Sequence, residues 1–304
     1  MSKKIISMLF IGLMLSLALS YTVQAGDTGK QTGLLYFDDD GAFQNGYNLF
    51  TKLSATTVYL TDTMGRVVNT WTDTATTGLS LYLRTDGDLL RTTKSDDSTV
   101  GVSGRFSAGG VGGRVKRISW GGSVEWNYIY STSLHRSHHD IEELPNGNIL
   151  MVAWEYKNQT ECLNAGRYSN QMTAGELWPD TIVEVNPSTS QIVWEWHFWD
   201  HLSCDRAGSW TANGRAVSSD TTDSGLVDIN YCPDTTADWT HTNAVDYNAD
   251  LNQIVISCRS LDEIYIIDHD TTTQEAIGSA GKFLYRWGNP LAYQTGSSTN
   301  HKLF

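Results

Sequence analysis

The sequence predicts an all-β protein, a β-propeller of four-stranded blades, and two observations support this prediction. First, three stretches follow one plan: an opening strand, a turn with Gly, Asn or Asp, an apolar strand, and a hairpin that closes on a tryptophan. These stretches are residues 78–130, 138–197 and 241–287, closing on Trp126, Trp194 and Trp287. Second, a looser copy runs from about Gly33 to Trp71. Repeats of this size made only of strands are typical of β-propellers, because a single blade cannot bury both of its faces.

Strand and turn signals place the elements in order. Residues 58–71 are predicted to form a hairpin around an Asp/Gly turn. Residues 115–126 and 182–194 form similar hairpins. The turn sequences at 145–148 and 248–252 separate the first two strands of the third and fourth modules. Helix signals are nearly absent after residue 25, so the strands have to build the core.

Two long segments interrupt the repeated pattern of strands and turns. Residues 155–180 lie inside the third module, and residues 198–239 separate the third module from the fourth. Segments of this length are usually functional lids or loop clusters. The glycine-rich segment Gly101–Gly113 lacks the Lys-Ser/Thr and the following helix of a phosphate-binding loop. We therefore expect a flexible connection within a blade.

The first 25 residues have the pattern of a secretory signal peptide. Lys3 and Lys4 precede an apolar run, and a small-residue cleavage site ends at Ala25. The run is short for a membrane span, and no later segment is apolar enough to be one. We therefore expect a periplasmic or secreted protein, with residues 26–304 forming one domain.

The charge of the chain is strongly acidic. Its formal net charge is −13, and loss of Lys3 and Lys4 with the signal peptide would make it −15. This charge argues against nucleic acid or an anionic membrane as a partner.

Four cysteines occur in this exported chain, so disulfides are allowed. Cys204 and Cys232 lie in the same long segment, which favours that pair. Cys258 lies in a predicted strand and is expected to be a buried thiol. None of the cysteines has the CxxC spacing of a zinc or redox site.

The candidate chemistry lies at the start of two opening strands. His138, His139 and Asp140 begin one of them, His241 and Asn243 begin the next, and Arg259 follows that module's second strand. If the opening strands line the propeller axis, these side chains face one another. A lone histidine at a strand start is usually structural, but recurrence at equivalent places favours a function. Imidazole, amide and guanidinium donors suit a tetrahedral anion whose charge is spread over several oxygens.

A metal site is a weaker interpretation. His197, Asp200 and His201 could join Asp140 in binding a metal, but His197 closes an outer strand far from the axis. We therefore predict no metal.

Several long motifs in one order resemble the secreted bacterial arylsulfotransferase family of β-propeller enzymes. They cover most of the chain after Gly33: SHHDIEELPNGNIL, LWPDTIVEVNP, IVWEWHFWDHL, LVDINY, DWTHTNAVDYNADLNQIVIS, DEIYIIDHDTTT and LYRWGNPLAY. The resemblance implies transfer of a sulfuryl group from an aryl sulfate to a phenol through a transiently sulfated histidine, without a nucleotide sulfate donor or other cofactor. It implies that His138 or His139, His241, Asn243 and Arg259 surround the sulfuryl group, and that Asp140 contributes to substrate binding.

The resemblance also predicts that the chain is truncated. Family members continue with a Gln-His motif that opens the next blade, and its histidine, the expected nucleophile, is missing here. About four blades of an expected six would be present, the ring would be incomplete, and this fragment would be inactive. Ile254, Ile256, Ile264 and Ile266 are expected to line the uncovered face of the fourth module.

Two other functions stay open at this point. A propeller that only binds a ligand or protein is favoured if the histidines do not converge. A quinone-dependent dehydrogenase-like propeller has similar hairpins, but the sequence lacks the calcium site and paired acidic residues of that class. The expected partners are a small aryl sulfate and a phenol, and a homodimer is compatible with the sequence.

Overall fold

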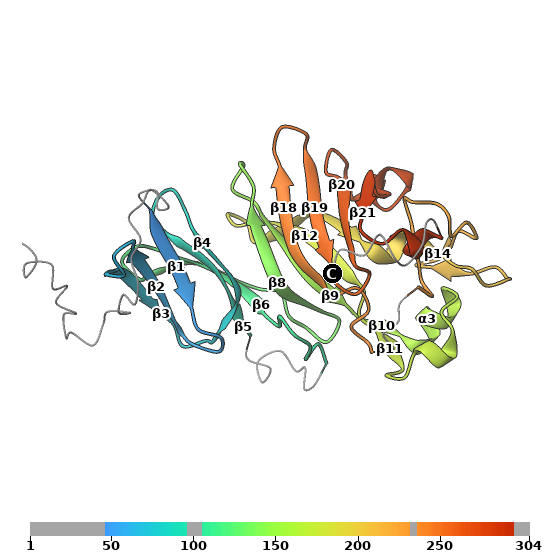
Figure 1. Ribbon diagram of the computed structural model, residues 1–304, viewed down its shortest axis with the longest axis horizontal. Coiled ribbons are helices and arrows are strands. Elements are labelled where there is room, and N and C mark those ends of the chain that lie inside the picture. Colours follow the sequence, from blue (N-terminus) through green and yellow to red (C-terminus); the bar gives the residue numbers. More distant parts are fainter. Residues whose placement is uncertain (1–45, 96–104, 232–235, 295–304) are drawn as a thin grey trace, which may run out of the picture. The chain divides into compact units, whose positions relative to one another are not determined.

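The computed structural model describes residues 46–95, 105–231 and 236–294 (Figure 1). Their contacts divide them into two units, the first with residues 46–50 and 59–70 and the second with the rest. The signal peptide expected at 1–25 lies outside the described residues. Among those residues, no helix has the length and the apolar character that a membrane crossing requires.

The first described sheet has three strands in the order β1-β2-β3. The described residues of the first unit belong to this sheet and its turns. The strands are β1 (Tyr47–Thr51), β2 (Thr57–Asp62) and β3 (Val67–Thr72). β2 and β3 confirm the hairpin predicted for residues 58–71. The beginning of the looser copy, residues 33–45, lies outside the described residues.

Three four-stranded antiparallel sheets confirm the other three predicted modules. The second module contains β4 (Thr77–Leu83), β5 (Leu89–Lys94), β6 (Gly113–Ile118) and β7 (Val124–Ile129). The third contains β8 (His135–Glu143), β9 (Ile149–Glu155), β12 (Asp180–Asn186) and β13 (Gln191–His197). The fourth contains β18 (Thr242–Asn248), β19 (Gln253–Cys258), β20 (Glu263–Asp268) and β21 (Tyr285–Trp287).

The opening strands of these three modules are neighbours. β8 lies against both β4 and β18, as the middle of Figure 1 shows for β8 and β18. Each opening strand also has a register shift against its partner strand, between Thr77 and Leu81, between Ser137 and Ile141, and between Thr242 and Ala244. Such β-bulges re-aim side chains locally. The all-β class is therefore confirmed, whereas the ring and its number of blades stay predictions.

The closing tryptophans join one module to the next. Trp126 Nε1 donates to Ser190 Oγ at 3.3 Å, and Trp194 Nε1 donates to Thr271 Oγ1 at 3.4 Å. Both acceptors lie after the third strand of the following module. The equivalent Trp287 is 53% exposed. The repeat therefore recurs in its contacts as well as in its strands.

The predicted uncovered face of the fourth module is wrong for two of its residues. Ile254 and Ile256 are fully buried, whereas Ile264 and Ile266 are half-buried. In the register of β19 and β20, Ile254 pairs with Ile267 and Ile256 pairs with Tyr265. Because side chains alternate between the faces of a sheet, Ile264 and Ile266 point the other way.

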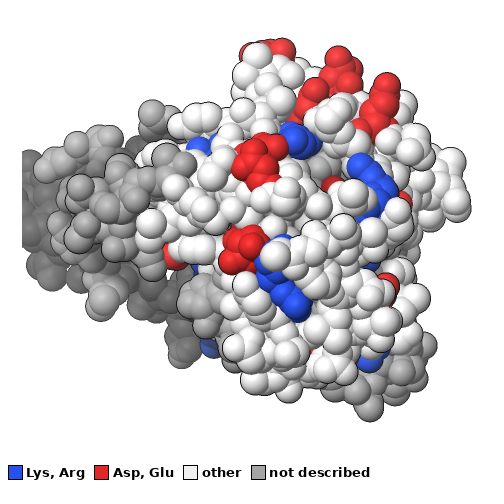
Figure 2. Space-filling model, turned by 90° about the vertical axis from the view of Figure 1, so that its right-hand side faces the viewer, with Lys and Arg blue, Asp and Glu red and all other residues white. Residues whose placement is uncertain are grey.

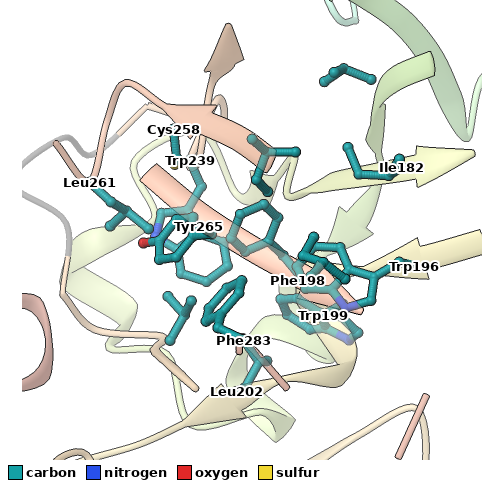
Figure 3. Packing of buried hydrophobic residues seen from close by; sticks show 14 of the residues in the cluster. Ile182, Trp196, Phe198, Trp199, Leu202, Trp239, Cys258, Leu261, Tyr265 and Phe283 are labelled. Atoms are coloured by element: carbon teal, nitrogen blue, oxygen red, sulfur yellow. The ribbon is translucent and has the colours of Figure 1, made fainter. Parts of the chain in front are cut away.

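An aromatic core fills the space around the third and fourth modules (Figure 3). Tyr265 and Phe283 stack with ring centroids 4.1 Å apart, and Phe198 contacts both rings edge-on. Trp196 and Trp199 are buried beside them. Full burial of a large apolar side chain stabilises a fold by about 1.5–3 kcal/mol, so this cluster firmly anchors the long segments that contribute to it.

The two interrupting segments pack against each other as a loop cluster. Arg206 Nη1 donates to the carbonyl oxygens of Gly166 and Arg167, both at 3.0 Å. The first segment contains β10 (Lys157–Asn158), α3 (Gln159–Asn164), η1 (Ser169–Gln171) and β11 (Glu176–Leu177). The second contains η2 (Phe198–Asp200), β14 (Leu202–Ser203), β15 (Thr211–Ala212), β16 (Arg215–Ala216) and β17 (Val227–Asp228). The remaining short helices are α4 (Thr273–Ala276), η3 (Ser279–Gly281) and η4 (Pro290–Tyr293).

The cysteines of the described residues are buried. Cys258 is a buried thiol, as predicted, with its Sγ 2.8 Å from the carbonyl oxygen of Thr240. Cys204 is a free, buried thiol, and its predicted partner Cys232 lies outside the described residues. The Cys204–Cys232 bridge therefore stays a prediction.

Candidate active site

Two histidines with an unusual backbone lie close together, His139 within the bulge of β8 and His241 directly before β18. His139 has φ 49° and His241 has φ 50°, the left-handed region that residues other than glycine rarely adopt. Such a conformation costs on the order of 1–3 kcal/mol and is concentrated at functional sites. The rings of His139 and His241 lie edge to face, with centroids 4.7 Å apart. The sequence-predicted histidines therefore meet.

His138 lies behind this pair and is almost fully buried. Its Nε2 is 2.9 Å from Oδ1 of Asp180, and its Nδ1 is 2.8 Å from Nδ1 of His139. The ring also stacks on Trp154, with centroids 3.8 Å apart. Both nitrogens of His138 are therefore engaged by protein groups.

Asp180 is the last residue of the first interrupting segment and the first residue of β12. Burial acts to raise the pKa of its carboxyl, but the hydrogen bonds from His138 and Thr242 lower the pKa overall. Thr242 N donates to Oδ2 of Asp180 at 2.5 Å. Asp180 is therefore a buried carboxylate held ionised by its donors.

His139 is held as a neutral imidazole. Burial, followed by the neighbouring His138 and His241, lowers the pKa of His139 to about 3. Among the described residues, only His138 makes a hydrogen bond to the ring, at Nδ1. Nε2 of His139 therefore makes no hydrogen bond to another described residue.

His241 has the opposite character. Its Nδ1 donates to Oδ2 of Asp238, and this hydrogen bond outweighs burial and raises the pKa of His241. Asp238 is fixed in turn by Trp154, whose Nε1 donates to Oδ1 at 2.8 Å. Two adjacent imidazoles thus have pKa values moved in opposite directions, which is how enzymes separate a base from an acid.

Arg259 and Asn243 complete the predicted set on the solvent side. Both residues are exposed. The positive charge of Arg259 acts to lower the pKa of both His139 and His241, and its backbone N donates to the carbonyl oxygen of His241 at 3.1 Å. No hydrogen bond or ion pair joins its guanidinium to another residue within the described ranges. Arg259 is therefore a cation beside the imidazole pair.

Asp140 joins the opening strands to one another. Its Oδ1 accepts from Ser80 Oγ and Tyr82 Oη, both at 2.8 Å, and its Oδ2 accepts from Val245 N at 3.2 Å. Ser80 belongs to β4 and Val245 to β18, so one carboxylate connects three modules. Its predicted part in substrate binding stays a prediction.

Sequence reasoning missed three parts of this site. Asp180 and Asp238 were not singled out, although Asp238 stands three residues before His241. The end of the glycine-rich segment, predicted only as a connection, packs on the imidazoles. A Cβ on Gly110 would lie 2.1 Å from Cε1 of His139, and a Cβ on Gly109 would lie 3.8 Å from Cε1 of His241.

The candidate metal ligands His197, Asp200, His201 and Asp140 are not grouped around a common point. His197 lies at the end of β13, where its Nδ1 is 3.4 Å from Oε1 of Glu155, and Glu155 raises its pKa against the effect of burial. Within the described ranges, no group of three or more His, Cys, Asp or Glu side chains is arranged to hold a metal ion.

The fold and the site together define an all-β protein in which neighbouring opening strands carry paired imidazoles, with an arginine beside them. The family model for arylsulfotransferases (ASST) matches residues 24–290, and the chain belongs to this family. No curated protein matches the chain.

Two solved structures are similar at low identity. The Dos1 propeller is 10% identical, with 82% of this chain and 58% of that chain covered and a TM-score of 0.34. A hypothetical protein from Leishmania major is 7% identical, with 75% and 59% covered and a TM-score of 0.29. The chain thus spans less than two thirds of the length of either protein.

Proposed function

We propose that the protein transfers a sulfuryl group from an aryl sulfate to a phenol by way of a sulfated imidazole. The observation that carries this proposal is the pair His139 and His241, which are in contact and have pKa values moved in opposite directions. Family membership supports small aryl substrates. The proposal needs one neutral imidazole, one proton donor and a cation, and the site offers each of them.

The sequence predicted that the accepting histidine is missing and that this fragment is inactive; we propose instead that His139 accepts the sulfuryl group. His138 has both nitrogens engaged, and His241 donates to Asp238, which raises the pKa of His241. A neutral imidazole with an available lone pair is the form that acts as a nucleophile.

The reaction then proceeds in two balanced steps. The Nε2 lone pair of His139 bonds to sulfur while the bond from sulfur to the aryl oxygen breaks, and His241 gives its Nε2 proton to the departing aryl oxide. The oxygen of the acceptor phenol then bonds to sulfur, the bond from sulfur to Nε2 breaks, and His241 takes the phenol proton. Both imidazoles return to their starting states.

Arg259 and Asn243 act on the sulfuryl oxygens in this scheme. A loose transition state spreads negative charge over three equatorial oxygens, as in phosphoryl transfer. A preorganised donor at such a position typically contributes about 2.7–4 kcal/mol to lowering the barrier. Both residues are exposed, and we assign the Arg259 guanidinium and the Asn243 amide to the sulfuryl oxygens.

The test combines turnover with identification of the sulfated residue. The purified protein is mixed with an aryl sulfate and a phenol, and a parallel sample without the phenol is digested for mass spectrometry. We expect phenol-dependent release of the aryl alcohol and a sulfated peptide containing His139. The variant His139→Gln should lose both signals. His269→Gln is the matched control, because His269 bonds to Glu184 of the third module and Asn252 of the fourth and not to the paired imidazoles.

Two results would contradict the proposal. Release of the aryl alcohol at the same rate from His139→Gln would show that His139 is not the acceptor. If the protein shows no turnover and no sulfation, these residues do not have the catalytic role proposed for them.

A binding function is the second candidate, and one cavity favours it. The cavity has a volume of about 350 Å³ and lies between the second and third modules, with Leu90 and Ile149 as apolar walls and Trp126, Arg84 and Glu143 as polar or aromatic walls. This volume is within the range of small-molecule sites. If the cavity serves a binding protein, a small polyol should change the fluorescence of the wild type but not of Trp126→Phe, while the assay above stays negative.

A further inference from the structure

The buried pair Asp180 and His138 is connected in series to His139. Asp180 Oδ1 is 2.9 Å from His138 Nε2, and His138 Nδ1 is 2.8 Å from His139 Nδ1. The side chains of Asp180 and His138 have no exposed surface. This chain of contacts determines where the protons lie, because a carboxylate can only accept and a neutral imidazole has one donor and one acceptor nitrogen.

The first proton position follows from Asp180. Its carboxylate accepts from Thr242 N through Oδ2 and has His138 Nε2 against Oδ1. A buried carboxylate oxygen facing a nitrogen lone pair would be strongly unfavourable. His138 therefore bears a proton on Nε2.

The second proton position depends on the charge of His138. The side chain of His138 has no exposed surface, and its ring stacks on Trp154 with centroids 3.8 Å apart. A charge on this ring would lose its hydration, whereas the neutral ring already donates to Asp180 from Nε2. His138 is therefore neutral, and its Nδ1 has to accept a hydrogen bond from His139.

We propose that Asp180 and His138 are positioning residues that fix the tautomer of His139, with its proton on Nδ1 and its lone pair on Nε2. The lone pair then lies on the nitrogen that makes no hydrogen bond to another described residue. The catalytic consequence, a ring ready to bond to sulfur, rests on the proposed function. The tautomer itself does not.

The variant Asp180→Asn tests the series of contacts with one atom changed. Thr242 N can only donate, so the new amide must turn its oxygen toward Thr242 and its NH₂ toward His138. His138 Nε2 then accepts, its Nδ1 donates, and His139 is forced into the opposite tautomer with its proton on Nε2. A wrong tautomer of a catalytic histidine lowers kcat by about 10⁴-fold in the serine-protease triad, and we expect a loss on the order of 10³-fold or more.

The readout is ¹⁵N NMR of labelled histidines, which separates protonated from bare ring nitrogens. In the wild type we expect His139 protonated on Nδ1 and bare on Nε2, and Asp180→Asn should reverse this assignment. The variant His138→Gln keeps a donor toward Asp180 and an acceptor toward His139, so the wild-type tautomer should persist. Asp228→Asn is the control for an Asp-to-Asn change at a buried position away from these contacts, and it should change neither tautomer nor turnover.

The outcomes separate this inference from the proposed function. The inference is overturned if His139 of the wild type carries its proton on Nε2, a measurement that needs no variant. It is also overturned if folded Asp180→Asn leaves the tautomer unchanged. If the tautomers are as stated but no sulfuryl group is transferred, the proposed function fails and the positioning role stands.

Discussion

Replacing Gly110 by alanine should damage the site through one added methyl group. Gly110 has φ 78°, and its backbone lies over the ring of His139. An added Cβ would lie 2.1 Å from Cε1, 2.2 Å from Nδ1 and 2.3 Å from Nε2 of that ring. Since real Cβ atoms do not approach other atoms so closely, the imidazole or the glycine-rich segment has to move.

The size of the effect can be separated into two contributions. An alanine with a left-handed backbone costs about 1–2 kcal/mol, and overpacking a filled site costs about 1–3 kcal/mol more. Gly147→Ala is the matched control, because Gly147 has φ 83° and a Cβ there would meet nothing within 4 Å. We therefore expect Gly110→Ala to be less stable than Gly147→Ala by about 1–3 kcal/mol.

Urea denaturation of both variants, followed by tryptophan fluorescence, measures this difference. The ¹⁵N spectrum of His139 should change in Gly110→Ala and stay as in the wild type in Gly147→Ala. If the two variants unfold at the same urea concentration and both leave the His139 signals unchanged, the backbone at Gly110 is not in close contact with the His139 ring. The reasoning about the glycine-rich segment would then be wrong.

Three further predictions concern other parts of the molecule. Asp238 raises the pKa of His241, so turnover that needs protonated His241 should fall as pH rises through that pKa, and Asp238→Asn should move this fall to lower pH. Trp194→Phe removes the donor to Thr271 and should lower the free energy of unfolding by about 0.5–1.5 kcal/mol, measured by thermal denaturation. In an exporting host, N-terminal sequencing of the exported protein should begin at residue 26; a retained N-terminus would contradict the signal-peptide prediction.

The strand modules could be predicted because their signals are local. Alternating apolar residues, turn sequences and a closing tryptophan recur along the chain, and the structure reproduces three complete modules. The prediction of the uncovered face was wrong because the face on which a side chain lies depends on the register between two strands. Ile254 pairs with Ile267, so its side chain lies on the face opposite Ile264. Moving one residue along a strand is enough to change a side chain from the surface face of the sheet to the core face.

The candidate site could be predicted in its histidines but not in their chemistry. His139 and His241 were identified from equivalent positions in two modules, a pattern visible in the sequence. Their carboxylate partners could not be paired in advance, since Asp180 reaches His138 across 42 positions of the chain. Packing of the interrupting segments decides that contact, and no local pattern encodes it.

The opposite characters of the two imidazoles therefore arise from their surroundings. His139, within the bulge of β8, and His241, directly before β18, share a left-handed backbone, and their rings are in contact. Burial is the main cause that lowers the pKa of His139, whereas the hydrogen bond from Nδ1 to the carboxylate of Asp238 raises the pKa of His241. Asp238 stands near the end of the second interrupting segment, and Asp180 is the last residue of the first. The modules thus supply neighbouring positions for the two histidines, and burial and the Asp238 carboxylate move their pKa values in opposite directions.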